Sequence, residues 1–111
     1  SIVTPCFNMV DYIEETILSV INQKNKNFEY IIIDGGSTDG SIEVIKRYSK
    51  HLSYWVSEPD NGMYHAIQKG FEKSNGELMG WINADDILLP GCLDSVFHTF
   101  SHNDCLWVRG L

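Results

Sequence analysis

Two adjacent carboxylates, Asp85 and Asp86, follow a short apolar run that begins at residue 78. The run predicts a buried strand, and ligands of open α/β sheets bind beyond the carboxyl ends of the strands. Two acids at such an end repel each other unless a cation or a polar ligand offsets their charge. We therefore predict that Asp85 and Asp86 hold a divalent metal ion and part of a nucleotide. The alternative is that one of them only caps the following turn or helix, as Asp often does.

A third carboxylate, Asp34, follows the apolar residues 30–33 at the end of another predicted strand. A carboxylate there can accept a hydrogen bond from a base imino N–H, and so recognise uracil or guanine. The alternative is turn chemistry, because Asp favours such corners. The glycines at positions 35, 36 and 40 match neither G-x-G-x-x-G nor G-x-x-x-x-G-K-[ST]. We interpret this segment as a tight turn and helix cap, with Asp34 as its one candidate contact.

Other reactive side chains carry weaker signals. Phe7 can stack on a base, although a single aromatic residue more often belongs to the core. Cys6 has no nearby His to activate it as a nucleophile, which favours a buried thiol. His98 and His102 are spaced as a possible metal pair on a helix, but no acid or cysteine accompanies them. Lys69 can reach a phosphate, and a solvated lysine is the simpler interpretation.

The charge balance constrains any ligand. Fifteen acidic side chains against eight lysines and arginines give a net charge of −7 without a basic cluster, which excludes nucleic-acid binding. A diphosphate beside the carboxylates is also repelled, by about 1 kcal/mol per charge pair at 4 Å in water and about 4 at an effective dielectric of 20. A bridging divalent cation, Mn²⁺ or Mg²⁺, reverses the sign of this interaction. We therefore expect binding of a phosphorylated ligand to depend on metal.

The cysteines and the hydropathy bear on location. Cys6, Cys92 and Cys105 are odd in number and far apart, which favours reduced thiols in the cytoplasm. No apolar run has the length of a membrane span, and no signal segment opens the chain. Because the sequence begins at Ser1 inside an expected strand, we expect it to be part of a longer protein.

Strand and helix signals alternate along the 111 residues. Strands are expected at residues 2–5, 28–33, 52–56, from 78 to the acidic pair, and at 106–108, and helices at 11–22, after Gly40, at 63–73 and after Gly91. Such alternation implies right-handed βαβ units and a parallel sheet covered on both faces. We predict one Rossmann-like α/β domain over residues 1–111, with a mostly parallel sheet in a three-layer α/β/α arrangement.

Four segments together resemble the nucleotide-binding half of a family 2 glycosyltransferase of the GT-A fold. They are S-I-V-T-P-C-F-N at 1–8, E-Y-I-I-I-D-G-G-S-T-D-G-S at 29–41, E-P-D-N-G-M-Y-H-A-I-Q-K-G at 58–70 and G-E-L-M-G-W-I-N-A-D-D at 76–86. Their order and spacing agree over nearly the whole chain. The resemblance implies a sheet of order 3-2-1-4 and transfer of a sugar from a nucleotide-diphosphate donor to a glycan or lipid-linked acceptor.

The resemblance also implies a role for each matching residue. Pro5 and Phe7 would line the base pocket, and Asp34 would bind the base, commonly uracil. The acidic pair would stand in for the family's D-x-D motif, with Asp85 near the ribose and Asp86 coordinating the metal that bridges the diphosphate. Enzymes of this kind often act at the cytoplasmic face of a membrane, so a peripheral position at the inner face is a further expectation.

The sequence departs from the family at several positions. Gly35 stands where many relatives carry a second Asp, and His65 and Gln68 stand where Asp and Asn are frequent. These differences put the donor preference in doubt more than the reaction. Inverting members use an acidic base well downstream, so we expect the catalytic base beyond Leu111 and direct displacement at the anomeric carbon.

Three alternatives remain at this point. A sugar-phosphate nucleotidyltransferase would need a Gly- and Arg-rich loop after the first strand, which residues 5–8 do not supply. A receiver-like signalling domain would need a downstream Lys at a strand end in addition to a phosphoacceptor such as Asp34. An inactive domain that only binds nucleotide-sugar is compatible with every motif above.

Overall fold

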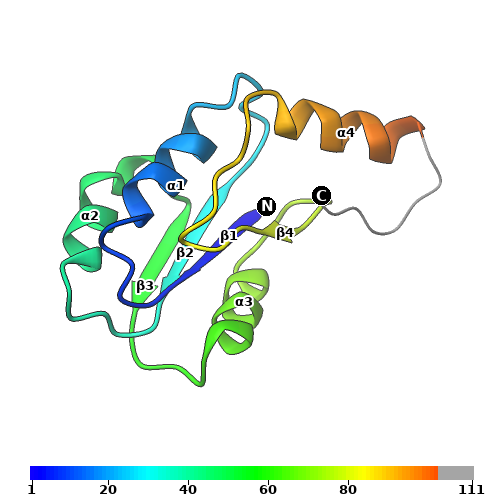
Figure 1. The fold of residues 1–111 in the computed structure, drawn as a ribbon. Coiled ribbons are helices and arrows are strands. Elements are labelled where there is room, and N and C mark those ends of the chain that lie inside the picture. The colour runs from blue at the N-terminus through cyan, green and yellow to red at the C-terminus, as the bar shows by residue number, and fades with distance from the viewer. Residues whose placement is uncertain (103–111) are drawn as a thin grey trace.

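The computed structural model describes residues 1–102, which form a four-stranded parallel sheet with helices on both faces (Figure 1). The strands are β1 (Ile2–Cys6), β2 (Tyr30–Asp34), β3 (Tyr54–Ser57) and β4 (Gly80–Trp81), in the order β3-β2-β1-β4. The helices are α1 (Ile13–Ile21), α2 (Ser41–Arg47), α3 (Met63–Glu72) and α4 (Cys92–His102), with a 3₁₀ turn at Ser49–His51. The predicted α/β class and strand order are confirmed. The strand expected at 106–108 and Cys105 lie outside the described residues.

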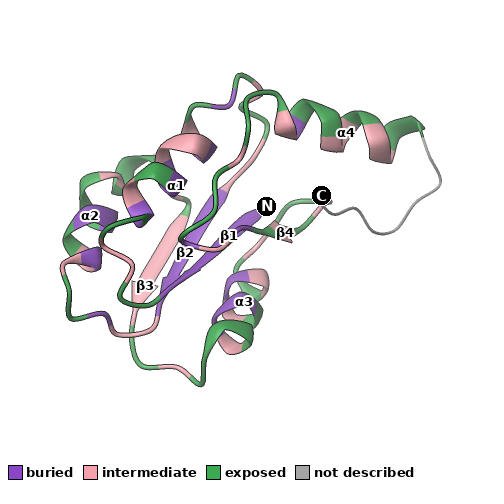
Figure 2. Cartoon of the chain, viewed as in Figure 1, coloured by how far each residue is buried: buried purple, intermediate pink, exposed green. Residues whose placement is uncertain are grey.

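An apolar core lies on each face of the sheet, because successive residues of a strand point to opposite faces. On one face, Ile2 and Ile32 pack with the buried residues of α1 and α2. On the other face, Val3 and Ile31 pack with Ala66 of α3. The buried strands β1 and β2 lie in the middle of the molecule, between these helices (Figure 2). Both central strands are buried along their whole length, as expected for a parallel sheet covered on two sides.

Helix α3 lies unusually close to β1. A Cβ atom added at Gly70 would overlap with Cγ1 and Cγ2 of Val3. Glycine at this position, in the last turn of α3, therefore allows the helix backbone to approach the strand.

The strand before the acidic pair is shorter and more exposed than the sequence predicted. Only Gly80 and Trp81 pair with β1, and Met79 and Trp81 are 58% and 40% exposed. Within residues 1–102 this strand lies at the edge of the sheet, which explains why the prediction of a buried strand was wrong. The buried residues of this segment are Ile82 and Ala84, which join the core beneath α1.

The predicted helix boundaries need one correction. The helix expected at residues 11–22 begins at Ile13, because residues 9–12 form a turn in which the N–H of Ile13 bonds to the carbonyl of Met9. In α4, Leu93 faces the core, and Phe97 packs against the same cluster. No helix within residues 1–102 has the length and apolarity needed to cross a membrane.

Candidate functional site

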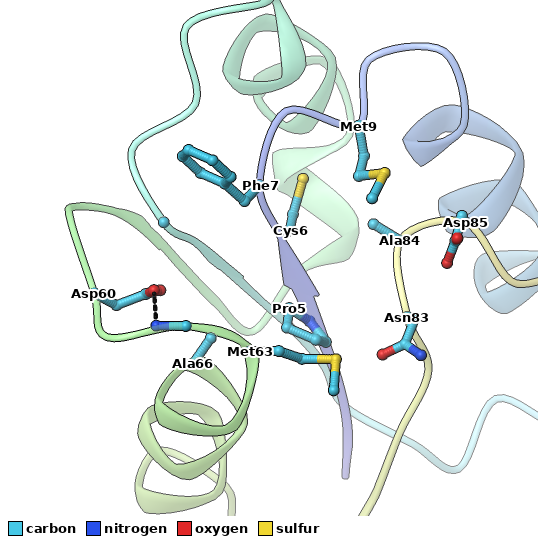
Figure 3. Close-up of a pocket in the computed structure, with 12 residues that line it drawn as sticks. Pro5, Cys6, Phe7, Met9, Asp60, Met63, Ala66, Asn83, Ala84 and Asp85 are labelled. Atoms are coloured by element: carbon cyan, nitrogen blue, oxygen red, sulfur yellow. Dashed lines mark hydrogen bonds between the residues drawn. The ribbon is translucent and has the colours of Figure 1, made fainter.

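A cavity of about 580 Å³ lies beyond the carboxyl end of β1. Its walls come from the loop after β1, the first turn of α3 and the loop after β4 (Figure 3). Pro5, Phe7 and Met63 make its walls largely apolar, and polar groups come from Asp60, Asn83 and Asp85. A concave apolar site with a few polar groups, at the carboxyl end of a parallel sheet, is the usual form of a small-molecule site.

The structure separates the predicted site residues into two groups. Pro5, Phe7 and Asp85 line the cavity, whereas Asp34 and Asp86 are absent from its wall. Phe7 is 58% exposed, which is unusual for a large apolar side chain and leaves its ring available for stacking. The roles predicted for these residues remain predictions.

The loop that carries Phe7 is held in place by the turn after β2. The amide of Asn8 donates to Oγ of Ser37 at 2.8 Å, and the amide of Thr38 donates to Oδ1 of Asn8 at 2.9 Å. Asn8 has a φ of 51°, in the left-handed region where Asn is one of the better tolerated side chains. These contacts turn the chain sharply after β1 and bring Phe7 to the cavity.

Asp34 is fully buried, and its carboxylate is used to build the same turn. Oδ2 accepts hydrogen bonds from the amides of Gly36 (3.0 Å) and Ser37 (2.8 Å) and from the hydroxyl of Ser57 on β3 (2.8 Å), while Oδ1 accepts from Oγ of Ser37 (2.6 Å). Such an Asx-type turn matches the alternative considered for Asp34 in the sequence. Four donors on one buried carboxylate favour a structural role.

Helix α1 positions the loop that carries Asp85. The hydroxyl of Thr16 lies 2.8 Å from the carbonyl oxygen of Ala84 and 2.6 Å from that of Asp86, so its proton is shared between the carbonyls on either side of Asp85. One turn later Oγ of Ser19 accepts the amide of Leu88 at 3.0 Å. The loop is therefore held by hydroxyl groups of Thr16 and Ser19 on α1, a helix whose other buried side chains are apolar.

Gln23 extends the same support to α4. Its side-chain amide donates to the carbonyl of Leu89 at 2.9 Å, and its side-chain oxygen accepts the amide of Leu93 at 3.3 Å. Gln23 is itself buried, so these bonds satisfy polar atoms that have little access to water. The segment from Ala84 to the start of α4 is thus held from one side by α1.

Asn83 is a candidate site residue that the sequence argument missed. Its Oδ1 is shielded from solvent and has no hydrogen-bond partner among the described residues. Figure 3 shows the Asn83 amide directed into the cavity, toward Met63, at the same end as Asp85. An unpaired buried amide oxygen is costly unless a ligand satisfies it. The sequence signal for Asn83 is its position two residues before Asp85, where its side chain can lie on the same side of the loop as the Asp85 carboxylate.

The donor set at this end fits a hard divalent cation shared with a ligand. Asp85 and Asn83 supply two oxygen donors, and within residues 1–102 no group of three or more His, Cys, Asp or Glu side chains is arranged to hold a metal ion by itself. Mg²⁺-like cations are commonly bound by one or two carboxylates, with phosphate and water oxygens completing the shell. A cation here would therefore depend on the ligand for several of its bonds.

The surroundings of three other candidates favour the simpler interpretation of each: a buried thiol, a surface lysine and surface histidines. Burial, and next the charge of nearby Asp34, raise the pKa of the Cys6 thiol to about 12, so the thiolate is scarce at neutral pH. Lys69 forms an ion pair with Glu58 at 2.8 Å. The rings of His98 and His102 lie with centroids 4.2 Å apart on exposed positions of α4.

Comparison with known proteins identifies the family of this chain. The model of glycosyl transferase family 2 matches residues 1–109. This chain belongs to glycosyltransferase family 2. The family match confirms the resemblance recognised in the four sequence segments, and it disfavours the nucleotidyltransferase and receiver-like alternatives.

Proteins of similar sequence are also named as glycosyltransferases. A Bacillus subtilis (strain 168) protein named "Putative teichuronic acid biosynthesis glycosyltransferase TuaG" is 35% identical over 91 residues, which cover 78% of this chain and 35% of that protein. An uncharacterized glycosyltransferase of Haemophilus influenzae is 31% identical over 113 residues, covering 99% of this chain and 45% of that protein. The chain thus spans between a third and a half of the length of these relatives.

Solved structures show the same fold. A crystal structure of S. aureus TarS 1–349 in complex with UDP-GlcNAc matches with a TM-score of 0.79 and 21% identity, covering 91% of this chain and 31% of that one. Another crystal structure of S. aureus TarS matches with a TM-score of 0.78 and 22% identity, covering 91% of this chain and 19% of that one. These matches confirm the GT-A fold expected from the sequence.

Proposed function

We propose that this chain is the donor-binding part of a glycosyltransferase that transfers sugar from a nucleotide-diphosphate sugar, in the first instance a UDP-sugar, to a glycan or lipid-linked acceptor. The observation that carries the proposal is the division of the cavity into two ends. One end has Phe7 for the face of a base, the other has Asn83 and Asp85 for a cation and a diphosphate, and Pro5 lies between the two ends. S. aureus TarS 1–349, which has the same fold, was crystallised in complex with UDP-GlcNAc, and this supports the same class of ligand here.

We further propose that binding depends on Mn²⁺ or Mg²⁺, held by Asp85 with the amide oxygen of Asn83. The sequence had favoured Asp86 as the ligand. The presence of Asp85 in the cavity wall, and the absence of Asp86 from it, favour Asp85. The cation, when bound, neutralises charge that develops on the diphosphate leaving group.

The proposed reaction is an inverting displacement. The acceptor hydroxyl oxygen forms a bond to the anomeric carbon while the bond from that carbon to the diphosphate oxygen breaks, and a carboxylate base takes the hydroxyl proton. We place this base and the acceptor site in the remainder of a longer protein. The described cysteines Cys6 and Cys92 are free thiols, which supports a cytoplasmic enzyme, and a lipid-linked acceptor would bring it to the inner membrane face.

Calorimetric titration of UDP into the chain, with and without Mn²⁺, tests the proposal. We expect binding that requires Mn²⁺, that is lost in Asp85→Asn and that persists in Asp86→Asn. Loss in Asp86→Asn alone would return the metal to the residue that the sequence favoured. A folded chain that binds neither UDP nor GDP in the presence of metal would contradict the proposal.

The same titration addresses the alternative of a binding-only domain. Such a domain would bind UDP as described but would leave the longer protein without transfer activity. Donor consumption by that protein, measured as release of UDP from UDP-sugars, separates the two functions.

A further inference from the structure

We infer that Asp60, and not Asp34, is the carboxylate that recognises the nucleobase, and that it selects bases with an imino N–H. The inference rests on the proposed function, because it assigns the base end of the same cavity. Asp60 lies in the loop between β3 and α3, three residues after the end of β3 and 26 residues after Asp34. It lines the cavity together with Pro5 and Phe7.

The carboxylate of Asp60 occupies the space left by the missing side chain of Gly35. A Cβ atom built on Gly35 would lie 3.1 Å from Oδ2, 3.2 Å from Oδ1 and 3.3 Å from Cγ of Asp60. Gly35 directly follows β2 and its amide bonds to the carbonyl of Cys6. A carboxylate therefore lies at the carboxyl end of β2, and it belongs to Asp60 in the loop after the neighbouring strand β3.

The two candidate acids differ in how many of their oxygen atoms remain available. Both oxygens of Asp34 accept hydrogen bonds, and its side chain is fully buried. Asp60 is half-buried, and its Oδ1 accepts the amide of Gly62 at 2.9 Å, the bond drawn in Figure 3. Within the described residues Oδ2 of Asp60 has no hydrogen-bond partner. Asp60 is thus held in one orientation with one acceptor oxygen left for a ligand.

The position of Asp60 suits the edge of a base. Figure 3 shows it on the same side of the cavity as Phe7, and Asn83 and Asp85 on the other side. A base whose face lies on Phe7 and Pro5 can direct its edge toward Asp60, while its diphosphate extends toward Asp85. The two acids therefore serve opposite ends of one ligand.

A carboxylate at this place discriminates among bases. It can only accept hydrogen bonds. Uracil, thymine and guanine offer an imino N–H on the pairing edge, whereas cytosine and adenine present a lone pair there and are repelled. A hydrogen bond to a charged acceptor changes affinity by about 10- to 100-fold. We therefore expect UDP to bind at least about tenfold more tightly than CDP, and GDP more tightly than ADP.

The test compares the affinities of UDP and CDP, at saturating Mn²⁺, for the 111-residue chain and its Asp60→Asn variant. The variant's amide can donate to cytosine N3, so we expect the UDP-to-CDP ratio to fall by about tenfold or more. The matched control Asp94→Asn changes an exposed acid on α4 that does not line the cavity, and should leave the ratio unchanged.

A second pair of variants tests the spatial argument. Asp60→Gly should abolish the preference for UDP, and Gly35→Asp combined with Asp60→Gly should restore part of it, because the new side chain enters the space that Asp60 vacates. Gly35 does not have a positive φ, so its backbone accepts Asp. A double variant with the ratio of Asp60→Gly would overturn the inference.

The outcomes separate the two proposals. If the unmodified chain binds none of UDP, GDP, CDP and ADP, the proposed function fails and the inference fails with it. If the chain binds UDP but Asp60→Asn leaves the UDP-to-CDP ratio unchanged, only the inference fails. Urea unfolding of each variant identifies any loss that comes from an unfolded chain.

Discussion

Replacing Asp34 by Asn should reduce stability and leave nucleotide recognition in the folded protein intact. The amide oxygen of Asn can take the place of Oδ2, which accepts from Gly36, Ser37 and Ser57. Each of these three bonds then changes from a charged to a neutral acceptor, a loss of about 0.5–1 kcal/mol each given the usual difference between the two kinds. The Oγ–H that donates to Oδ1 loses its acceptor as well. The expected total cost is about 2–4 kcal/mol.

Urea unfolding measures this cost directly. With a typical slope for a small domain, a loss of about 2–4 kcal/mol lowers the urea midpoint by about 1–3 M at unchanged slope. Ser57→Ala removes one of the donors and, as the matched control, should lower stability by about 1 kcal/mol. An Asp34→Asn chain with unchanged stability but much weaker UDP binding would refute the reasoning. That result would show that Asp34 contacts the base, as the sequence had suggested.

Three further predictions follow from particular contacts. Thr16→Val removes the hydroxyl shared by the carbonyls on either side of Asp85, so we expect several-fold weaker Mn²⁺-dependent UDP binding in calorimetry and a stability loss of about 1–2 kcal/mol; unchanged affinity would show that the loop needs no such support. Gly70→Ala should cost about 1–3 kcal/mol by overlap with Val3, and Val3→Ala in the same chain should recover part of the lost urea midpoint. Burial and the nearby Asp34 charge raise the pKa of the Cys6 thiol from 9.0 to about 12. The protonated thiol therefore contributes fully to the stability of the folded state below pH 9, and this contribution is lost as the pH rises toward 12. Iodoacetamide should label Cys6 in the folded chain far more slowly than in urea, and equal rates would contradict its burial.

The fold could be predicted from the sequence where local patterns are strong. The β-branched run before Asp34 and the alternation of strand and helix signals predicted the parallel sheet, because buried parallel strands are apolar on both faces. The strand before Asp85 was harder to define. Its apolar residues suggested burial, but pairing with β1 extends over only two residues, and Met79 and Trp81 remain exposed.

The site could be predicted only in part, because its decisive contacts join residues distant in the sequence. The hydroxyl of Ser57, 23 residues after Asp34, helps to make Asp34 a buried turn residue. The approach of Asp60 to Gly35 depends on how the loop after β3 crosses the end of β2. Nothing local in E-P-D-N-G distinguishes a cavity-lining acid from an ordinary turn, since Asp is common in both.

The most direct measurement is a crystal structure of the chain with UDP and Mn²⁺. The account predicts the uracil face against Phe7, its imino N–H at Asp60, and a cation bonded to Asp85 and to diphosphate oxygens. UDP bound outside the cavity, or a cation held by Asp86 and not by Asp85, would contradict it.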